Sequence, residues 1–456
     1  MDPLDKMLKI IYEDNHLLVC EKPINMPVQA DSSGDTDLLT LAKEYIKHKY
    51  NKHGEVYLGL VHRLDRPVGG VMVFARTSKA AARLTNSFKT RSTIKRYAAI
   101  VMGKPRDHAN LRDWLVRDES TNTSFVSNEN TTGAKEASLD YARVTTKNGL
   151  SLVDVLLHSG RHHQIRVQLS NSGFPIYGDQ RYNRQAVVGQ QIALYAYSLS
   201  IEHPTMKTRM TFTSIPSGGA WSAFTEELKA LSCGVRCSYI DENVICVNKR
   251  AGIACTAADA SAASSGCGGN SLETDLFSAF GGREVYPVHR LDVMTTGLVL
   301  FARNKNAEFG LTKAIKQRTI KKTYHAEVFG RPESKNGRLT LYGIKDAERS
   351  IMSVYDRPMP RAVEMITDYR VISTVGGRSL LEIELVTGRT HQIRASLAHI
   401  GCPIVGDDKY GDRTLNKTNK SGLHLAAVRI EFPQDMGSLK GLEGRVIETS
   451  AEFEND

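Results

Sequence analysis

The alternation of hydrophobic and polar positions along the chain predicts many short strands with helices between them. The apolar runs GGVMVFAR (69–76) and TGLVLFAR (296–303) are typical of buried strands. The stretches KRYAAIVMG (95–103) and KTYHAEVFG (322–330) alternate as half-buried strands do. IIYEDNHLLVCEKP (10–23) predicts two short strands joined by a tight turn. Short strands interspersed with helices indicate an α+β fold.

Apolar residues recur at helical spacing after each buried strand and again later in each half of the chain. TSKAAARLTNSFKT and NKNAEFGLTKAIKQ predict helices with Thr77 and Asn304 as N-caps. QIRVQLSNSG and QIRASLAHIG each predict a helix that ends at a glycine. The polar segment 127–133 and the low-complexity segment 256–271 are expected to be loops, the second of them exposed to solvent.

Nearly every one of these stretches occurs twice. VHRLD stands at 61–65 and at 288–292, an offset of 227 positions, and SGRHHQIRVQL (159–169) matches TGRTHQIRASL at an offset of 228. A period of this length is the size of a domain and too long for a solenoid repeat. The sequence therefore predicts two similar domains, residues 8–230 and 231–456.

Composition narrows the class of protein. No apolar stretch approaches the roughly 18 residues of a membrane span, so no membrane segment is expected. The net charge of +10 favours a polyanionic partner, of which nucleic acid is the commonest. Seven cysteines without a CxxC pair, and a start that does not have the pattern of a signal peptide, predict reduced thiols and a cytoplasmic location.

Four functional groups recur at nearly constant separation: an Asp, a Tyr and two Arg. In each half one Arg lies two residues before the Asp, a Tyr lies 32 residues after it, and the other Arg lies 101 or 102 residues after it. One alternative is a buried Asp–Arg ion pair that only locks two strands, because buried charges are costly unless they are paired. Recurrence of the whole set favours a functional cluster instead.

The motif series HRLDRPVGG, KRYAAIVMG, GRHHQIRVQL and GFPIYGDQRY resembles that of RluA/RsuA-like pseudouridine synthases, and the second half repeats it with VHRLDVMTTG, KTYHAEVFG, TGRTHQIR and GCPIVGDDKYG. The resemblance implies a mixed, largely antiparallel sheet with flanking helices, duplicated in tandem. It implies RNA pseudouridine synthase activity, an isomerase reaction, on structured RNA, with ribosomal RNA favoured over transfer RNA. No cofactor, metal or obligatory protein partner is expected, and no GxGxxG, Walker loop or metal-ligand motif occurs in the sequence.

The resemblance also implies roles for the recurring residues. Asp65 and Asp292 correspond to the family's essential carboxylate, and Arg166 and Arg394 to the arginine that keeps it ionised and oriented. The detailed action of the carboxylate, on the sugar or on the base, stays open.

Two further pairs are assigned in the same way. Tyr97 and Tyr324 correspond to the active-site tyrosine that stacks on the flipped base. Arg63 and Arg290 are candidates to fill the gap that the base leaves in the RNA.

Other polar residues of the motifs are predicted to be less central. His62 and His289 are expected to be structural, His163 and His391 remain open between the two roles, and Asp179 and Asp407 are expected to form turns.

The first half departs from the common motif at two positions. Gly69 lacks the hydroxyl of Thr296, and His162 stands where the second half has Thr390. Both halves are nevertheless expected to be active, and RNA affinity is expected from the catalytic domains themselves. The competing hypotheses are a catalytically silent RNA-binding protein and a glycosidase, which would require a second carboxylate near each Asp.

Overall fold

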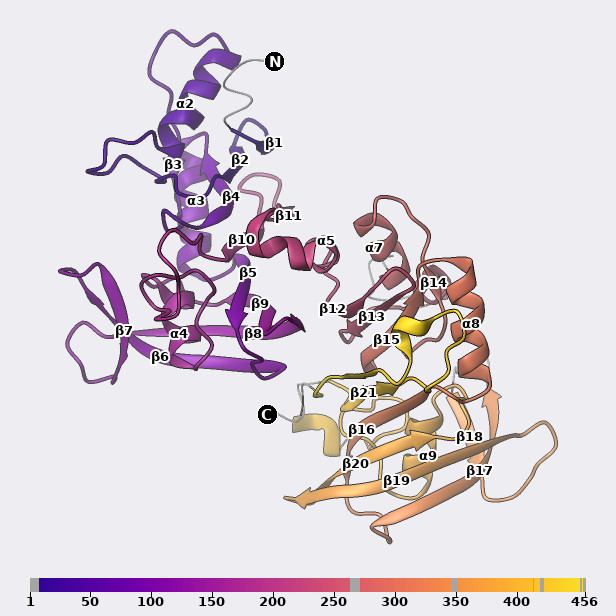
Figure 1. Cartoon of the computed structure of the whole chain (residues 1–456). Coiled ribbons are helices and arrows are strands. Elements are labelled where there is room, and N and C mark those ends of the chain that lie inside the picture. The colour runs from indigo at the N-terminus through magenta and orange to yellow at the C-terminus, as the bar shows by residue number, and fades with distance from the viewer. Residues whose placement is uncertain are drawn as a thin grey trace. The chain divides into compact units, whose positions relative to one another are not determined.

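The computed structural model describes residues 8–262, 271–346, 351–412, 414–418, 422–451 and 453. The chain divides into two compact units, Met1–Ser232 and Cys233–Asp456, each built on an 11-stranded sheet (Figure 1). The first unit contains, in chain order, β1 (Ile10–Glu13), β2 (Leu17–Lys22), α2 (Leu38–Lys49), β3 (Gly59–Leu60), β4 (Gly69–Ala75), α3 (Ser78–Lys89), β5 (Ile94–Met102), β6 (His108–Asp118), β7 (Thr123–Ser127), β8 (Lys135–Lys147), β9 (Leu150–Leu157), α4 (Gln164–Asn171), β10 (Leu194–Glu202), β11 (Arg209–Thr213), η1 (Gly219–Phe224) and α5 (Thr225–Ser232).

The second unit repeats this plan. Its elements are β12 (Cys237–Ile240), β13 (Val244–Lys249), α6 (Ala257–Ala262), α7 (Leu272–Ala279), β14 (Tyr286–Pro287), β15 (Thr296–Ala302), α8 (Lys305–Lys316), β16 (Lys321–Phe329), β17 (Asn336–Asp346), β18 (Ile351–Tyr355), β19 (Val363–Val375), β20 (Arg378–Leu385), α9 (Gln392–His399), η2 (Leu415–Thr418), β21 (Leu425–Glu431), η3 (Lys440–Leu442) and β22 (Val446–Glu448).

Strand order is the same in the two sheets. It runs β1-β2-β4-β10-β5-β9-β8-β6-β7 in the first and β12-β13-β15-β21-β16-β20-β19-β17-β18 in the second. Neighbouring strands are antiparallel except for β4 with β10 and β15 with β21, which are parallel. The predicted α+β fold, a mixed and largely antiparallel sheet present twice, is confirmed.

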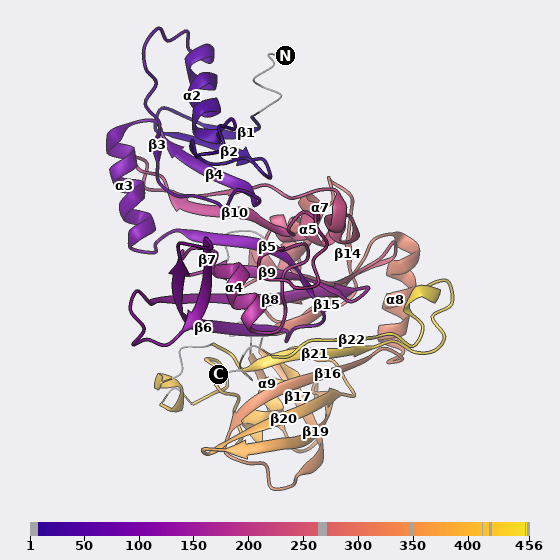
Figure 2. The same cartoon turned by 60° about the vertical axis from the view of Figure 1, so that its left-hand side comes forward.

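Strand β4 shows why an uninterrupted apolar run forms a strand here. Val71 and Val73 pack on one face of the sheet with Leu84 of α3. Met72 and Phe74 pack on the other face, in the cluster that includes the buried side of α2. Because both faces are covered by a helix, every position of β4 is apolar or small and buried. Figure 2 shows α2 and α3 beside this part of the sheet.

The helix ends and the first loop that the sequence predicted are confirmed. The Thr77 hydroxyl accepts a hydrogen bond from the Ala80 N–H (3.2 Å), and the Asn304 side chain accepts one from the Ala307 N–H (2.9 Å). Gly173, with φ of 89°, follows the end of α4 as predicted. Residues 128–133 form turns between β7 and β8, which confirms the expected loop.

The prediction that 256–271 is a loop was wrong in its first part. Ala257–Ala262 form the short helix α6, and the Thr256 hydroxyl accepts a hydrogen bond from the Asp259 N–H (3.1 Å). Alanine is the strongest helix former, which explains why this small-residue stretch is helical. Residues 263–270 lie outside the described residues.

Candidate active sites

The loop that carries Asp65 lies between β3 and β4 and is fixed from below by a buried lysine. The Lys22 ammonium donates hydrogen bonds to the backbone carbonyls of Pro23 (2.9 Å), Arg66 (2.9 Å) and Val68 (2.8 Å). Burial lowers the pKa of Lys22 to about 7, and the Asp65 carboxylate opposes part of that shift. The lysine thus ties the last residue of β2 to the loop that presents the carboxylate.

The second unit has the same arrangement. Lys249 donates to the carbonyls of Arg250 (3.1 Å), Ile253 (2.9 Å) and Val293 (2.7 Å). Sequence reasoning missed the role of these two lysines. The signal was present, because the repeat aligns Lys249 with Lys22. Three carbonyl acceptors converge only after folding, so no local pattern specifies them.

Directly after each Asp loop, a glycine lets two parallel strands meet. Gly70 has φ of 133°, and a Cβ there would collide with the Ala196 carbonyl oxygen of β10. Gly297 has φ of 100° and stands in the same relation to Ala427 of β21. This close approach requires glycine and fixes where the Asp loop leaves the sheet.

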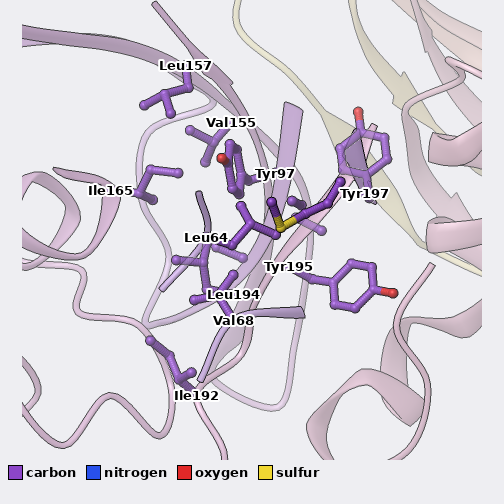
Figure 3. Close-up of a cluster of buried hydrophobic side chains, with 14 of the residues drawn as sticks. Leu64, Val68, Tyr97, Val155, Leu157, Ile165, Ile192, Leu194, Tyr195 and Tyr197 are labelled. Carbon is purple, nitrogen blue, oxygen red and sulfur yellow. The ribbon is translucent and has the colours of Figure 1, made fainter. Parts of the chain in front are cut away.

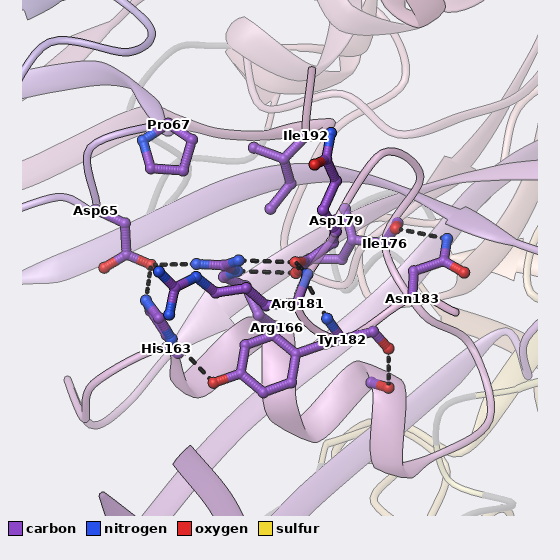
Figure 4. Close-up of polar contacts among 12 residues, drawn as sticks. Asp65, Pro67, His163, Arg166, Ile176, Asp179, Arg181, Tyr182, Asn183 and Ile192 are labelled. Atoms are coloured by element: carbon purple, nitrogen blue, oxygen red, sulfur yellow. Dashed lines mark hydrogen bonds and ion pairs between the residues drawn. The ribbon is translucent and has the colours of Figure 1, made fainter. Parts of the chain in front are cut away.

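Arg166 projects from the first turn of α4 and meets Asp65. Its Nη1 lies 3.5 Å from Asp65 Oδ2, and its Nε and Nη2 form a bidentate pair with Asp179 at 2.8 and 2.7 Å (Figure 4). Burial alone lowers the pKa of Arg166, but the hydrogen bonds and charge of Asp179 and the charge of Asp65 raise it overall. The Arg166 guanidinium also lies over the aromatic ring of Tyr182, with its Cζ 5.1 Å from the ring centroid.

The second unit has the same geometry to within 0.1 Å. Arg394 Nη1 lies 3.5 Å from Asp292 Oδ2, and Arg394 pairs with both oxygens of Asp407 at 2.8 and 2.7 Å. The sequence therefore correctly predicted that each Asp and its Arg come together.

Asp179 and Asp407 form turns, as expected, and each has a second role that the sequence did not predict. In the turns, Asp179 accepts the backbone N–H of Arg181 (3.1 Å) and Asp407 that of Lys409 (2.9 Å). Each is also a fully buried partner of the active-site arginine, with a 0% exposed side chain. Because both nitrogens of the bidentate pair are occupied by this Asp, only Nη1 remains directed at the reacting carboxylate.

Tyr97, the third residue predicted for the first site, lies in β5 and lines the same cavity as Asp65 and Arg166, which has a volume of about 740 Å³. Figure 3 shows its ring among the apolar side chains of Leu64, Val155 and Ile165. Burial raises the pKa of Tyr97, and the nearby Asp65 carboxylate raises it further, so the hydroxyl stays protonated. The cavity lies within the size range of pockets that enclose a small ligand.

Tyr324 is buried in β16 in the same way. Burial raises its pKa, and the charge of Asp292 adds to the effect. The structure thus brings Asp, Arg and Tyr together in each half.

The two exposed arginines of the HRLD motif differ between the units. Arg63 lines the cavity of the first unit and has no carboxylate partner among the residues that the structure describes. Arg290 donates to Asp259 Oδ1 of α6 at 2.7 Å. Within the described part of the chain, neither arginine forms an ion pair with the Asp two residues after it.

The histidines of the HRLD motif are structural, as expected. His62 accepts the backbone N–H of Val73 at its Nε2 (3.1 Å), and His289 accepts that of Leu300 (3.1 Å). Burial lowers the pKa of His62 to about 3, so the ring is neutral and can accept this hydrogen bond. The Thr296 hydroxyl, absent at Gly69, donates to the backbone carbonyl of Leu425 (3.3 Å), so it supports the sheet and not the Asp.

The rim of the first cavity is strongly basic. Besides Arg63, the cationic side chains that line it are Lys89, Arg91, Lys95, Arg117, Arg161 and Arg166. Asp65 is the one carboxylate among its described lining residues. A polyanion is the ligand that such a rim attracts.

No helix within the ranges that the structure describes is both long and apolar enough to cross a membrane. Within the same ranges, no group of three or more His, Cys, Asp and Glu side chains is arranged to hold a metal ion.

Comparison with known proteins gives the same family for both halves. The family model described as RNA pseudouridylate synthase matches residues 16–171 and again residues 243–399. Ribosomal large subunit pseudouridine synthase D of Zymomonas mobilis is 33% identical over 222 residues, which cover 46% of this chain and 70% of that protein.

Two further proteins are similar to about half of the chain. Ribosomal large subunit pseudouridine synthase C of Rickettsia bellii is 31% identical over 243 residues, covering 52% of this chain and 73% of that protein. Among solved structures, Human RNA Pseudouridylate Synthase Domain Containing 4 is 26% identical, covers 46% of this chain and 90% of its own, and has a TM-score of 0.40. The family's members are isomerases that act on RNA. Since the family model matches most of the chain in two successive regions, the protein belongs to the RNA pseudouridylate synthase family and carries the family's domain twice.

Proposed function

We propose that each half converts its own uridine to pseudouridine in structured RNA, with ribosomal RNA as the favoured substrate and transfer RNA as the second candidate. The proposal that both halves are active rests on one observation: the distance from Arg Nη1 to Asp Oδ2 is 3.5 Å in each unit. The preference for ribosomal RNA rests on relatives named ribosomal large subunit pseudouridine synthases.

The reaction is an isomerisation, so its atoms balance without a co-reactant. The bond between N1 of uracil and C1′ of ribose breaks, the base turns, a bond forms between C5 and C1′, and the C5 proton is lost while N1 gains one. In this proposal the Asp65 carboxylate, oriented by Arg166, supports cleavage of the glycosidic bond. Tyr97 offers its ring to the uracil and keeps its hydroxyl protonated.

The uridine has to leave its stack to reach the cavity. Eversion of a base costs a few kcal/mol, and a planar cation can stack in the vacated place. Arg63 and Arg290 are exposed on the loops next to the reacting carboxylates and are proposed to take this position. The basic rim of the first cavity is proposed to contact the phosphates around the everted nucleotide.

A glycosidase with the usual pair of carboxylates is disfavoured by the composition of the cavity. Asp65 is the one acidic side chain among the described residues that line it. Asp179, the next carboxylate, is buried behind Arg166 and bound by it on both oxygens. A second carboxylate free to act as a general acid is what that mechanism requires.

The proposal is tested by mapping pseudouridines in ribosomal and transfer RNA from cells that carry Asp65→Asn, Asp292→Asn or both. Each single variant is expected to lose its own set of sites, and the double variant both sets. Glu55→Gln, an exposed change in the first unit, serves as the control and is expected to lose none. If the Asp65→Asn cells keep every modification, the first domain only binds RNA, and loss confined to transfer RNA overturns the ribosomal assignment.

A further inference from the structure

A histidine lies between the reacting carboxylate and a tyrosine in both units, and its side chain is 7% exposed in the first unit and 11% exposed in the second. His163 Nε2 lies 3.7 Å from Asp65 Oδ2, and its Nδ1 lies 2.9 Å from the Tyr182 hydroxyl (Figure 4). In the second unit His391 Nε2 lies 3.7 Å from Asp292 Oδ2, and its Nδ1 lies 2.9 Å from Tyr410. The two units therefore hold this group in the same place.

The backbone of both histidines is held in an unfavourable conformation. His163 has φ of 51° and His391 has φ of 53°, in the left-handed region that residues other than glycine seldom adopt, although histidine, asparagine and aspartate do so more often than the rest. Neither side chain caps the helix that follows it. A strained residue that does not cap its helix, and that aims its ring at a reactive group, indicates a functional constraint.

The surroundings of the ring favour one nitrogen as the carrier of the proton. The backbone N–H of Ser124 in β7 donates to the Tyr182 hydroxyl oxygen (2.7 Å), and His163 Nδ1 lies 2.9 Å from the same oxygen. The Asp65 carboxylate that faces Nε2 can only accept a hydrogen bond, so we infer that Nδ1 accepts from the Tyr182 hydroxyl and that Nε2 carries the proton. In the second unit the Met352 N–H donates to Tyr410 in the same way (2.7 Å).

The ring stays neutral in this position. Burial lowers the pKa of His163 to about 2, and the charge of Arg166 contributes to the shift. Burial and Arg394 likewise lower the pKa of His391, against the opposing charge of Asp292. A neutral imidazole with its proton on Nε2 is a fixed donor, because it cannot take up a second proton at physiological pH.

Both donors of the site face one oxygen of the carboxylate. Arg166 Nη1 and His163 Nε2 approach Oδ2 of Asp65, and among the described residues Oδ1 makes no hydrogen bond or ion pair. We propose that His163 and His391 are positioning residues that, with the arginine, hold Oδ2 so that Oδ1 is the oxygen that reacts with the nucleotide. This inference rests on the proposed function. Separations of 3.5 and 3.7 Å are expected to shorten when RNA excludes water from the site.

The test compares two amide substitutions in a chain whose second site is silenced by Asp292→Asn. Glutamine places a side-chain N–H near the position of Nε2, whereas asparagine reaches only the position of Nδ1 and tolerates the left-handed backbone better. The single-turnover rate of pseudouridine formation on RNA that contains the first domain's uridine is measured together with the RNA Kd.

A positioning role predicts the order of rates His, then Gln, then Asn, with His163→Asn slower by about 100-fold and Kd changed less than threefold. A role only in backbone geometry or in binding Tyr182 predicts that Asn is at least as active as Gln, and that order overturns the proposal. Rates within twofold for all three proteins overturn it as well. Folding is followed by tryptophan fluorescence, since both tryptophans, Trp114 and Trp221, lie in the first unit.

Tyr182→Phe gives a second, independent variant if the histidine changes prevent folding. It removes the hydroxyl that directs the proton to Nε2 but keeps the ring under Arg166. We expect a loss of rate of about tenfold, and an unchanged rate overturns the proposal. If the Asp292→Asn parent itself forms no pseudouridine, the function proposed for the first half fails instead, so the two failures are distinguishable. The mirror experiment uses His391 variants in an Asp65→Asn chain.

Discussion

The two active sites share a set of inner residues and differ in the exposed residues around it. We call the inner set, formed by the Asp of the HRLD motif, the arginine, the histidine and the second Asp, the frame. The exposed loop residues next to it, which include Arg63 and Arg290, are the mouth of each site. In each unit the arginine lies 3.5 Å and the histidine 3.7 Å from the same oxygen of the reacting Asp, and a second, buried Asp binds the arginine. The arginine and the second Asp of each unit are buried and depend on each other for a partner in a low-dielectric environment. Loss of either would leave a buried charge without its bidentate partner, which explains how the frame stays the same while the sequences around it differ.

At the mouths the constraint is weaker, and the units differ there. Arg290 is paired with Asp259, whereas Arg63 has no such partner among the described residues and Arg66 of the same loop pairs with Asp35. Exposed groups can lose a partner to water at little cost. The difference teaches that the halves share their chemistry and diverge in how they meet RNA.

The largest effects are expected from breaking the shared frame. Asp179→Asn leaves Arg166 buried with a neutral partner, so we expect the first unit to lose about 3–5 kcal/mol of unfolding free energy and its own activity to fall at least about 100-fold. Urea unfolding followed by tryptophan fluorescence measures the stability of that unit. Asp407→Asn is expected to abolish the second activity to the same extent.

The matched control for the frame is Asp140→Asn, which removes an exposed partner of His158 in the first unit. We expect less than about 1 kcal/mol from that change. If Asp179→Asn costs no more than Asp140→Asn, the bidentate pair does not hold the site, and the explanation for the matching geometry is wrong.

The next largest effect is loss of stability in acid. The pKa of His62 is about 3 in the folded protein and about 6.5 when unfolded. The unfolded chain therefore binds the extra proton between these values, and stability falls as the pH drops below about 6.5, by about 1.4 kcal/mol per pH unit for this histidine. The urea midpoint of tryptophan fluorescence at pH 7, 6 and 5 measures the slope for the first unit.

His62→Gln keeps an acceptor for the Val73 N–H but does not titrate. We expect it to flatten the dependence on pH by that amount while the midpoint at pH 7 changes little. An equally steep slope in the variant would show that other groups carry the acid sensitivity.

A smaller effect, on RNA affinity, is expected to distinguish the mouth of the second site from that of the first. Asp259→Asn weakens the ion pair that holds Arg290, so the arginine is freer to enter RNA. Exposed pairs contribute about 0.2–1 kcal/mol, so RNA affinity at the second site should rise by at most about fivefold, with no change at the first. Asp35→Asn, which releases Arg66 and not the motif arginine, is the control. Weaker binding by Asp259→Asn would mean that α6 presents Arg290 to RNA and does not restrain it.

The sequence predicted those parts of the molecule that local patterns or the repeat could specify. Strand β4 is apolar throughout because helices cover both faces, and Thr77 caps α3 through a contact three residues away. Asp65 and Arg166 are 101 residues apart, and only their recurrence in the second half, with the family resemblance, predicted that they meet.

What sequence reasoning missed depends on contacts that only the tertiary fold creates. Asp179 stands in a glycine-aspartate turn and has the pattern of a turn residue, while its partner Arg166 projects from a different element. Lys22 has carbonyl partners 44 and 46 residues away, which leave no mark on its neighbours. Helix α6 is the exception, since the alanines after Thr256 were a readable helical signal.

The smallest effect is expected from His162→Thr, which gives the first unit the residue that the second unit has at the matching position, Thr390. The His162 ring stacks on His163 (3.8 Å between centroids) and shares a hydrogen bond with the Ser124 hydroxyl (3.0 Å). Tyr182 still holds His163 when His162→Thr removes these contacts, so we expect a rate within about threefold and a stability loss of about 1 kcal/mol. Single-turnover rates and the fluorescence midpoint measure both. If His162→Thr slows the reaction as much as His163→Asn, the mouth and the frame of the first site act as one, and the distinction between them does not hold in that half.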